Sequence, residues 1–195
     1  KSKFKMYFKK GKVIIISAPS GSGKTTIARY LLKQKFNLKF SVSACTRQKR
    51  INEVDGVDYF FFKVDDFKRK IKENNFLEWE EVYPNSFYGT LKKNVEYNLK
   101  LGYNILFDID VKGAMSLKKH FDKDSCSIYI DAPLNVIEQR LSDRNTETNK
   151  DLKLRLKKIK QESLSKINFD VIIENIDLHK AKEKAKKYVE NFLKK

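Results

Sequence analysis

A run of glycine, serine, lysine and threonine residues near the start of the chain has the composition of an anion-binding loop. The run reads Ala18-Pro19-Ser20-Gly21-Ser22-Gly23-Lys24-Thr25. Its two glycines let the backbone curl so that successive N–H groups point at one anion. Lys24 then neutralises phosphate oxygens, and the Thr25 hydroxyl is suited to hold Mg²⁺, directly or through water. The run therefore predicts a site for the phosphates of a nucleoside triphosphate.

The residues around this run favour a phosphate-binding loop over an ordinary Gly/Ser turn. An apolar stretch, 13–17, precedes it and is typical of a buried strand, while a helical pattern begins at Lys24. This order of strand, loop and helix is the required context, because the start of the helix adds the positive end of its dipole. Ala18 stands where glycine is most frequent in such loops, and we expect it to keep a negative φ. The loop leaves the reaction itself open.

The rest of the chain alternates short apolar runs with longer stretches of helical period. This alternation predicts an α/β fold, a P-loop NTPase-type five-stranded parallel sheet flanked by helices. Most of the apolar runs lack polar alternation, so we expect strands that are buried on both faces. The predicted strands are 13–17, 40–44, 104–108, 127–131 and 171–174. The predicted helices are 24–36, 91–101, 111–120, 134–143, 151–165 and 178–193.

Two segments depart from this pattern and predict insertions. Between Thr46 and Asn85, short aromatic pieces flank a helix-like stretch at 65–74, which indicates an inserted mixed α/β lobe. The second segment, 140–155, has a polar stretch between two helices and indicates a small helical lid. We expect a single domain over 1–195. Its predicted parts are a core at 1–41, 94–135 and 166–195, a lobe at 42–93 and a lid at 136–165.

The chain carries a large positive charge. It has 195 residues, with 42 Lys and Arg against 25 Asp and Glu, which gives a formal net charge of +17. A surplus of this size attracts nucleotides, RNA or acidic membrane surfaces. The lysines are scattered along polar helix faces, as in the run from Lys180 to Lys187, and this spacing favours a solvated surface. We therefore predict no nucleic-acid partner and no membrane partner.

The cysteines and the apolar runs bear on the compartment. Cys45 and Cys126 are too few for a disulfide framework and lie in apolar, strand-like stretches, so we expect buried free thiols in a reducing, cytoplasmic compartment. The longest aliphatic run has four residues, from Val13 to Ile16, which predicts neither a signal peptide nor a membrane span.

Several motifs in the right order carry a resemblance to a known family. They are Phe40-Ser41-Val42-Ser43, Thr46-Arg47, Gly56-Val57-Asp58-Tyr59, Phe87-Tyr88-Gly89-Thr90, Asp108-Ile109-Asp110 and Arg144-Asn145-Thr146-Glu147-Thr148. Almost end to end, the sequence resembles the guanylate kinase family. The resemblance implies a reversible, Mg²⁺-dependent transfer of a phosphoryl group from ATP to GMP, giving ADP and GDP. It also implies direct in-line attack by the GMP phosphate and a role in purine nucleotide metabolism.

The resemblance assigns partners to each part of GMP. The implied GMP-binding residues are Ser43, Arg47, Arg50, Tyr59, Glu78, Tyr88, Thr90, Asp108 and Asp110. The arginines and tyrosines among them would hold the phosphate, to which the guanidinium fork is suited. Glu78 would accept from the N1–H and N2–H₂ donors of guanine, a donor pair that adenine lacks. Taken without the family, the arginines could equally be surface charges and the tyrosines packing residues.

The implied ATP-binding residues are Ser20, Gly21, Ser22, Gly23, Lys24, Thr25, Thr26 and Asn175, the last lying near the adenine in the family. The implied catalytic residues are Lys24, Arg50, Arg140, Arg144 and Arg155. The last three are the only arginines in the C-terminal half of a lysine-rich chain, which indicates bidentate phosphate contacts made by a lid. The alternative is that they lie on charged faces of exposed helices. Asn145 stands where the family usually has glycine.

Three other functions are weighed against this one. A scaffold domain that binds phosphopeptides at the old GMP site would be expected to have a degraded phosphate loop, and Gly23, Lys24 and Thr25 are intact. A nucleic-acid-binding protein would be expected to show a basic stripe or stacking aromatics. A kinase of another nucleoside or sugar phosphate is disfavoured by Glu78. We expect Trp79 in the core and assign no role to the two histidines.

Overall fold

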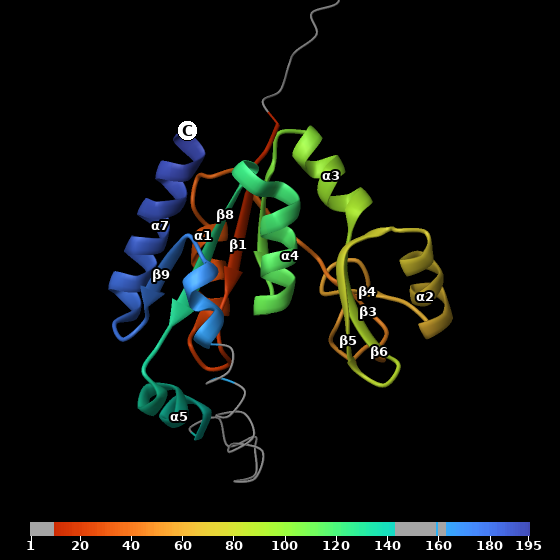
Figure 1. The fold of residues 1–195 in the computed structure, drawn as a ribbon, viewed down its shortest axis with the longest axis horizontal. Helices are drawn as coiled ribbons and strands as arrows, with labels where there is room; N and C mark the ends of the chain where they lie inside the picture. The colour runs from red at the N-terminus through yellow and green to blue at the C-terminus, as the bar shows by residue number, and fades with distance from the viewer. Residues whose placement is uncertain (1–9, 143–158, 160–162) are drawn as a thin grey trace, which may run out of the picture. The chain divides into compact units, whose positions relative to one another are not determined.

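The computed structural model describes residues 10–142, 159 and 163–195, with the backbone alone for residues 141 and 142 (Figure 1). The chain forms two compact units, and it passes from one to the other after Lys12, Phe36 and Ile105. We call them the loop unit, Val13–Phe36 with Leu106–Lys195, and the lobe unit, Asn37–Ile105 with the residues before Val13. The predicted division into core, lobe and lid stays a prediction.

The larger sheet has five strands in the order β2-β7-β1-β8-β9. Their bounds are β1 Val13–Ser17, β2 Leu38–Phe40, β7 Asn104–Asp108, β8 Ser125–Asp131 and β9 Val171–Glu174. Within the loop unit, β8 pairs in parallel with β1 on one side and with β9 on the other. Every residue of β1 is buried, as its unbroken apolar sequence predicts. The predicted α/β fold class is confirmed.

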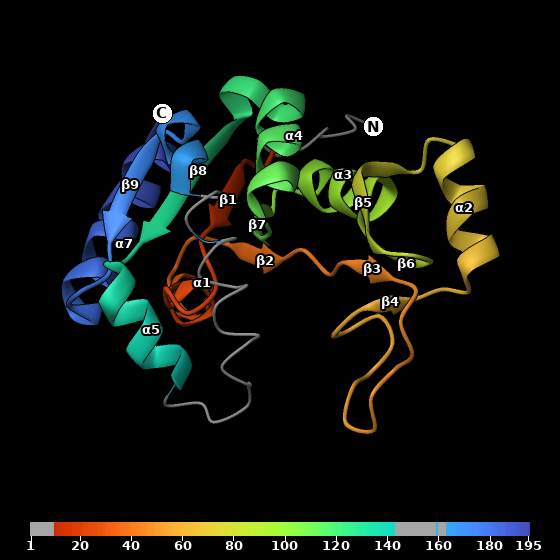
Figure 2. The same cartoon turned by 60° about the horizontal axis from the view of Figure 1, so that its bottom comes forward.

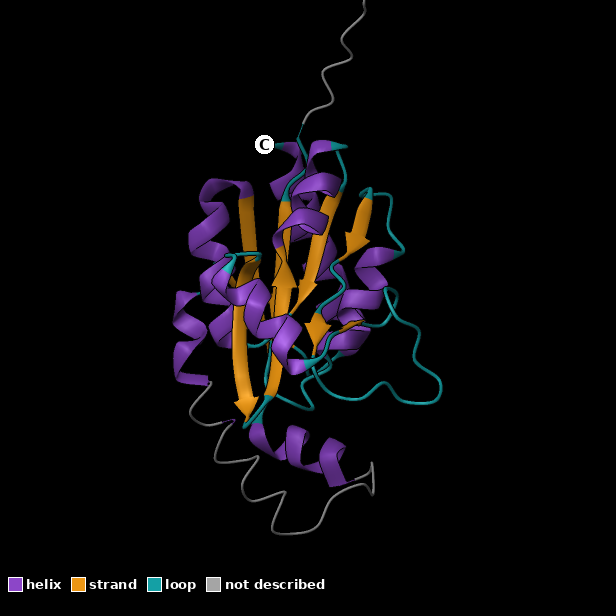
Figure 3. Cartoon of the chain, turned by 90° about the vertical axis from the view of Figure 1, so that its right-hand side faces the viewer, coloured by secondary structure: helices purple, strands orange, loops and turns teal. Residues whose placement is uncertain are grey.

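Helices cover both faces of these strands (Figure 3). In the loop unit they are α1 Lys24–Leu32, α4 Val111–Phe121, α5 Leu134–Ser142 and α7 Leu178–Lys194, with short 3₁₀ helices η1 Asp122–Asp124 and η2 Leu164–Asn168. Helix α1 packs on α7 and on β1, while α4 packs on β1 and β8. On α7 the buried positions are Ala181, Ala185 and Val189, which recur at the spacing of one helical face.

The lobe unit is built around a four-stranded sheet of order β4-β3-β6-β5. Its strands are β3 Ala44–Cys45, β4 Phe60–Phe61, β5 Phe76–Tyr83 and β6 Ser86–Leu91, and its helices are α2 Val64–Lys72 and α3 Lys92–Lys100. Helix α2 lies beside β5 and β6 (Figures 1 and 2). It buries Phe67 against the rings of Phe76 and Phe87 at centroid distances of 4.3 and 5.5 Å. At the two ends of the inserted segment, the N–H of Asn104 donates to the carbonyl of Asn37 at 3.0 Å.

Most of the predicted elements are present, but the strand predicted at 40–44 is wrong. The structure ends β2 at Phe40 and begins β3 at Ala44, so the single run spans strands of two different sheets. Strand β6 was not predicted, because Gly89 interrupts its apolar pattern. That glycine is required by packing, since a Cβ there would lie 2.8 Å from the Glu78 carbonyl oxygen.

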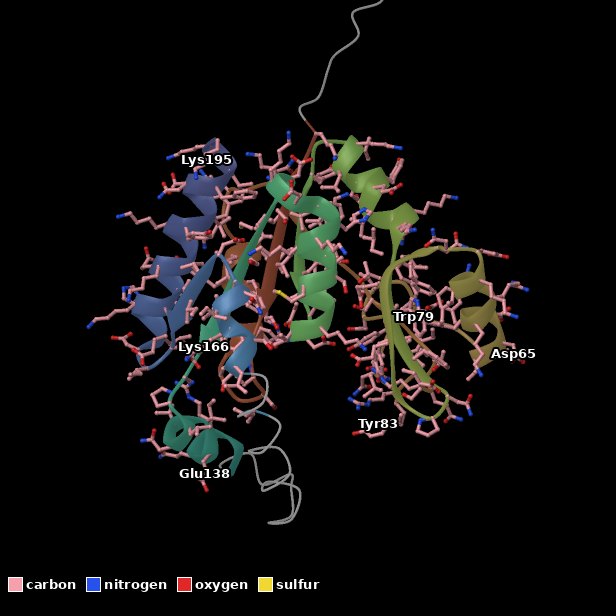
Figure 4. All side chains as sticks on the ribbon, viewed as in Figure 1. Asp65, Trp79, Tyr83, Glu138, Lys166 and Lys195 are labelled. Carbon is pink, nitrogen blue, oxygen red and sulfur yellow. The ribbon has the colours of Figure 1, made fainter. Side chains whose placement is uncertain are left out.

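Two further predictions need correction, and one is met. Helix α1 ends at Leu32 and not at residue 36. Asn37, the residue after the predicted end, takes a positive φ of 51°. Trp79, expected in the core, is 45% exposed on β5 (Figure 4). Cys45 and Cys126 are buried free thiols, as predicted. Most of the helix predicted at 151–165 lies outside the described residues.

No helix within the described ranges is long and apolar enough to cross a membrane.

Candidate functional site

The phosphate loop joins the buried strand β1 to helix α1. Gly21 and Gly23 have φ values of 84° and 91°, in the region that favours glycine, while Ala18 keeps a negative φ as expected. The first turn of the helix closes on Gly23, whose carbonyl accepts from the N–H groups of Thr26 and Ile27 at 3.1 and 3.2 Å. Loop N–H groups that precede this turn, together with the helix start, provide donors for an anion.

A carboxylate from the neighbouring strand contacts the end of the loop. The Nζ of Lys24 lies 2.7 Å from Oδ1 of Asp108 and donates to the carbonyl of Ile109 at 3.3 Å. The Thr25 hydroxyl donates to Oδ2 of the same carboxylate at 3.3 Å. Asp108 ends β7, so this contact lies at the carboxyl edge of the parallel sheet, where ligands of such sheets bind.

These oxygens fit a magnesium ion. A threonine hydroxyl and a carboxylate are hard oxygen ligands, and Mg²⁺ is usually held by one or two carboxylates together with substrate phosphates and water. Within the described ranges, no group of three or more His, Cys, Asp or Glu side chains could hold a metal by itself. Thr25 and Asp108 would therefore bind Mg²⁺ jointly with the phosphates of a nucleotide.

Asp110, two residues further on, has a local structural partner. One of its oxygens accepts from the Gly113 N–H at 2.8 Å, which makes Asp110 the N-cap of helix α4. The structure thus places Asp108 against Lys24 and Thr25, and Asp110 at the start of a helix.

One residue from the C-terminal half contacts the phosphate loop, and a second contacts that residue. Asn175 follows β9, is 1% exposed, and donates from its side-chain Nδ2 to the Ser22 carbonyl at 2.7 Å. Arg140 on α5 donates from Nη2 to the Asn175 carbonyl at 3.1 Å. Arg144 and Arg155, predicted to belong to the lid, lie outside the described residues.

In the lobe unit, one face of the β5–β6 hairpin carries several of the predicted residues. The register sets Glu78 opposite Thr90, and Glu80 opposite Tyr88. Residues two apart on a strand share a face, so these four side chains lie on the same face of the hairpin. The buried Thr90 hydroxyl donates to Oε1 of Glu78 at 2.6 Å, which orients the carboxylate.

Arg47 is held by a carboxylate to which the sequence assigned no role. Its Nη1 and Nη2 lie 2.7 and 2.5 Å from the two oxygens of Glu53, and Nη1 also donates to the Gln48 carbonyl at 3.0 Å. The guanidinium carbon lies 4.7 Å from the centre of the Tyr59 ring. In the sequence, this ion pair is indicated only by the opposite charges of two nearby residues, and such neighbours are too common for the pair to be predicted from them.

The ion pair governs the electrostatics of this cluster. The bond to Glu53 raises the pKa of Arg47 above its ordinary value. In turn, the bond to Arg47, followed by the backbone N–H of Arg50, lowers the pKa of Glu53 to about 2. Burial raises the pKa of Tyr59, and the charge of Arg47 partly offsets this. Tyr59 and Tyr88 meet edge to face at a centroid distance of 6.2 Å. The raised pKa values of Arg47 and Tyr59 thus favour the guanidinium cation and the protonated Tyr59 hydroxyl.

The two remaining residues predicted for the lobe are Arg50 and Ser43, and each makes a backbone hydrogen bond within the lobe unit. The Arg50 side chain is exposed, and its backbone N–H donates to Glu53 at 2.9 Å. Ser43 is half-buried, and its carbonyl accepts from the Phe60 N–H at 2.9 Å. The structure thus brings Arg47, Tyr59 and Tyr88 into one cluster, and Glu78 and Thr90 into one hydrogen bond.

A glycine loop that leads from a buried parallel strand into a helix, with a carboxylate beside its lysine and threonine, defines a nucleotide-binding P-loop protein. The family model described as guanylate kinase matches residues 10–192. The chain belongs to the guanylate kinase family. This confirms the resemblance and the enzyme class that it implied, a nucleoside monophosphate kinase.

Individual relatives agree with the family model. The chain is 47% identical over 183 residues to a guanylate kinase of Bacteroides fragilis, covering 93% of this chain and 90% of the relative. It is 41% identical over 182 residues to a guanylate kinase of Salinibacter ruber, covering 93% and 96%. The crystal structure of a guanylate kinase from Anaplasma phagocytophilum matches with a TM-score of 0.75 at 28% identity, over 96% of this chain and 88% of that one.

Proposed function

We propose that the chain transfers the terminal phosphoryl group of ATP to GMP, reversibly and with Mg²⁺, to give ADP and GDP for purine nucleotide metabolism. The choice of acceptor rests on one observation, the buried Thr90 hydroxyl that donates to Glu78 at 2.6 Å in a member of the guanylate kinase family. A cytoplasmic location remains a prediction.

On the donor side, the loop and its neighbours bind the triphosphate. Loop N–H groups and Lys24 would hold the phosphate oxygens, and Thr25 with Asp108 would hold the metal. When bound, Mg²⁺ supplies positive charge against the phosphates. Lys24 is already ion-paired with Asp108 at the loop, so its position needs little rearrangement when the nucleotide enters. Arg140 contributes from beside the loop, and the roles of Arg144 and Arg155 stay predictions.

On the acceptor side, Glu78 would accept from N1–H and N2–H₂ of guanine, while Thr90 fixes the carboxylate. Arg47, Arg50, Tyr59 and Tyr88 would hold the GMP phosphate. That phosphate is already an anionic nucleophile, so direct in-line attack on ATP needs no covalent enzyme intermediate and no side-chain base. Ser43, Asp108 and Asp110 complete the predicted acceptor set.

The test is a coupled ADP-release assay with ATP and Mg²⁺, in which GMP, dGMP, AMP, CMP and UMP are offered separately. We expect turnover with GMP and none of note with AMP, CMP or UMP. Glu78→Gln places an amide donor opposite the donors of guanine, so kcat/KM for GMP should fall by about 100-fold or more. Glu81→Gln is the matched control, because Glu81 lies on the same strand but accepts from the turn N–H of Asn85.

Two results would contradict the proposal. Nucleotide binding without turnover would favour the phosphopeptide-binding function. Equal turnover with AMP, or a Glu78→Gln variant that behaves like Glu81→Gln, would show that another residue selects the acceptor.

A further inference from the structure

The side chain of Asn175 is a buried polar group that the proposed reaction does not use. The resemblance places the matching asparagine near the adenine of ATP. Here, however, the side chain is 1% exposed and its Nδ2 donates to the Ser22 carbonyl at 2.7 Å. The two bonded residues are 153 positions apart in the chain. The amide nitrogen is thus committed to the backbone of the phosphate loop, while the Oδ1 of the same amide has no hydrogen-bond partner among the described residues.

We propose that Asn175 is a positioning residue for the phosphate loop, which fixes the direction of the Gly23 N–H. The C=O of Ser22 and the N–H of Gly23 belong to one trans peptide plane, so they point in opposite directions. By holding the carbonyl on the side of β9, Asn175 turns the N–H away from it, and an N–H with a fixed direction is preorganised to bind an anion.

Asn175 can act as a support because its own backbone is fixed at two points. Its N–H donates to the Asp131 carbonyl at 2.7 Å, at the end of the paired strands β8 and β9. Its carbonyl accepts from Arg140 of α5 at 3.1 Å. The side chain of Asn175 thereby ties the phosphate loop to the β8–β9 end of the sheet.

Gly23 and Asn175 also fit each other sterically. A Cβ at position 23 would lie 2.3 Å from Nδ2 of Asn175, and the φ of 91° disfavours a side chain there in any case. The amide therefore occupies the space that the absent side chain leaves, and it reaches the Ser22 carbonyl through that space. This closeness is the second observation that relates Asn175 to the loop.

The test compares the binding of ATP with that of inorganic tripolyphosphate, each with Mg²⁺, by calorimetry. Tripolyphosphate has no base, so it reports on the loop alone. In Asn175→Ala the Ser22 carbonyl loses a buried donor, and we expect the dissociation constants of both ligands to rise by the same factor, about tenfold. Asn175→Asp, which has nearly the same shape but sets an anion against the carbonyl, should weaken both further. It also provides a second variant if Asn175→Ala does not fold.

The matched control is Ser127→Ala. Ser127 is fully buried in the same unit, and its hydroxyl donates to Asp170 Oδ2 at 2.8 Å and accepts from the Asp170 N–H at 3.0 Å, so Ser127→Ala removes two hydrogen bonds without contact to the loop. Its thermal midpoint should fall while both dissociation constants stay unchanged. If the Asn175 variants bind ATP more weakly but tripolyphosphate normally, the residue acts on the adenine and the inference is wrong. If the Asn175 variants bind ATP and tripolyphosphate as tightly as Ser127→Ala does, the inference is also wrong.

The inference rests on the proposed function for its relevance to catalysis, but the binding test does not depend on turnover. Steady-state kinetics add a separate readout: the KM for ATP should rise in Asn175→Ala by more than the KM for GMP. A wild-type protein that binds tripolyphosphate but never phosphorylates GMP would contradict the proposed function and leave the role of Asn175 testable.

Discussion

At the scale of single residues, the pair of Arg47 and Glu53 shows how a binding group is prepared before its ligand arrives. Three N–H bonds to Glu53 and Gln48 use part of the five-donor guanidinium, whose carbon lies 4.7 Å from the centre of the Tyr59 ring. An arginine so held loses little side-chain entropy on binding a phosphate. In the proposed acceptor site, Glu53 would act on GMP through Arg47, without touching the nucleotide itself.

The substitution Glu53→Gln should reveal this role. We expect the KM for GMP to rise several-fold, with kcat and the KM for ATP changed much less, because the orientation of Arg47 is lost and the loop unit is untouched. Glu73→Gln is a control on the same unit, since Glu73 is the exposed residue that caps the C-terminal end of α2. A proportional fall of kcat with no change of KM would contradict the assignment.

The same pair predicts a dependence of stability on pH. The folded pKa of Glu53 is about 2, below the ordinary value of about 4.3 for an unfolded glutamate. A carboxyl group with a lowered pKa stabilises the fold above the unfolded value, and this contribution is lost as the pH falls through the folded value. The difference in the free energy of unfolding between wild type and Glu53→Gln should therefore be largest at neutral pH and shrink between about pH 4 and pH 2. Urea unfolding at several pH values would measure it, and a difference independent of pH would contradict it.

The residue scale also separates what the sequence could predict from what it could not. Lys24 and Thr25 were predictable because they are adjacent in the chain and their chemistry is local. The contact of Asn175 with Ser22 was not, because it depends on which strands the sheet sets side by side. Asp110 was expected at the ligand, and the structure adds a helix-capping bond that a sequence motif does not distinguish from a binding role.

At the scale of elements, the lobe depends on one aromatic cluster beneath α2. Phe67 is fully buried and stacks on Phe76, while Phe87 on β6 closes the other side. The face of the hairpin that carries Glu78 is thus kept in place by a core on the opposite face. The sequence predicted the helix-like stretch that forms α2 and aromatic pieces beside it, but no strand at β6, because Gly89 weakens the strand signal for a reason found only in the packing.

Removal of the Phe67 ring should destabilise this lobe. Phe67→Ala leaves a cavity in a stacked cluster, and we expect the free energy of unfolding to fall by about 3 to 5 kcal/mol. Phe40→Ala is the matched control, because that ring is 44% exposed and belongs to the same unit, and its loss should cost far less. Urea unfolding measures both. If Phe67→Ala and Phe40→Ala lower the free energy of unfolding equally, the aromatic cluster does not stabilise the lobe more than an exposed ring does.

At the scale of the whole molecule, the formal charge of +17 acts on every anionic substrate at once. Exposed lysines such as Lys184 and Lys187 lie on the outer face of α7, whose buried face carries Ala181, Ala185 and Val189. Such dispersed charge attracts nucleotides from a distance and does not build a site.

The charge should therefore be visible as a dependence on ionic strength. Between about 0.1 M and 1 M salt the Debye length falls from about 10 Å to about 3 Å, and we expect the KM values for ATP and GMP to rise across this range while kcat changes little. The double variant Lys184→Gln, Lys187→Gln should change kcat/KM by less than about twofold, because two charges are a small part of the total field. A large effect of this variant alone would mean that α7 carries a specific site.

The joined ends of the inserted segment have a consequence for protein engineering. The segment from Asn37 to Ile105 begins and ends at backbone groups that hydrogen-bond to each other, Asn37 and Asn104. A cassette of different length, closed by the same bond, could be grafted between Phe36 and Leu106 with little extra loop-closure entropy. We expect the grafted cassette to set the acceptor preference of such a chimaera, and the loop unit to keep the binding of the triphosphate.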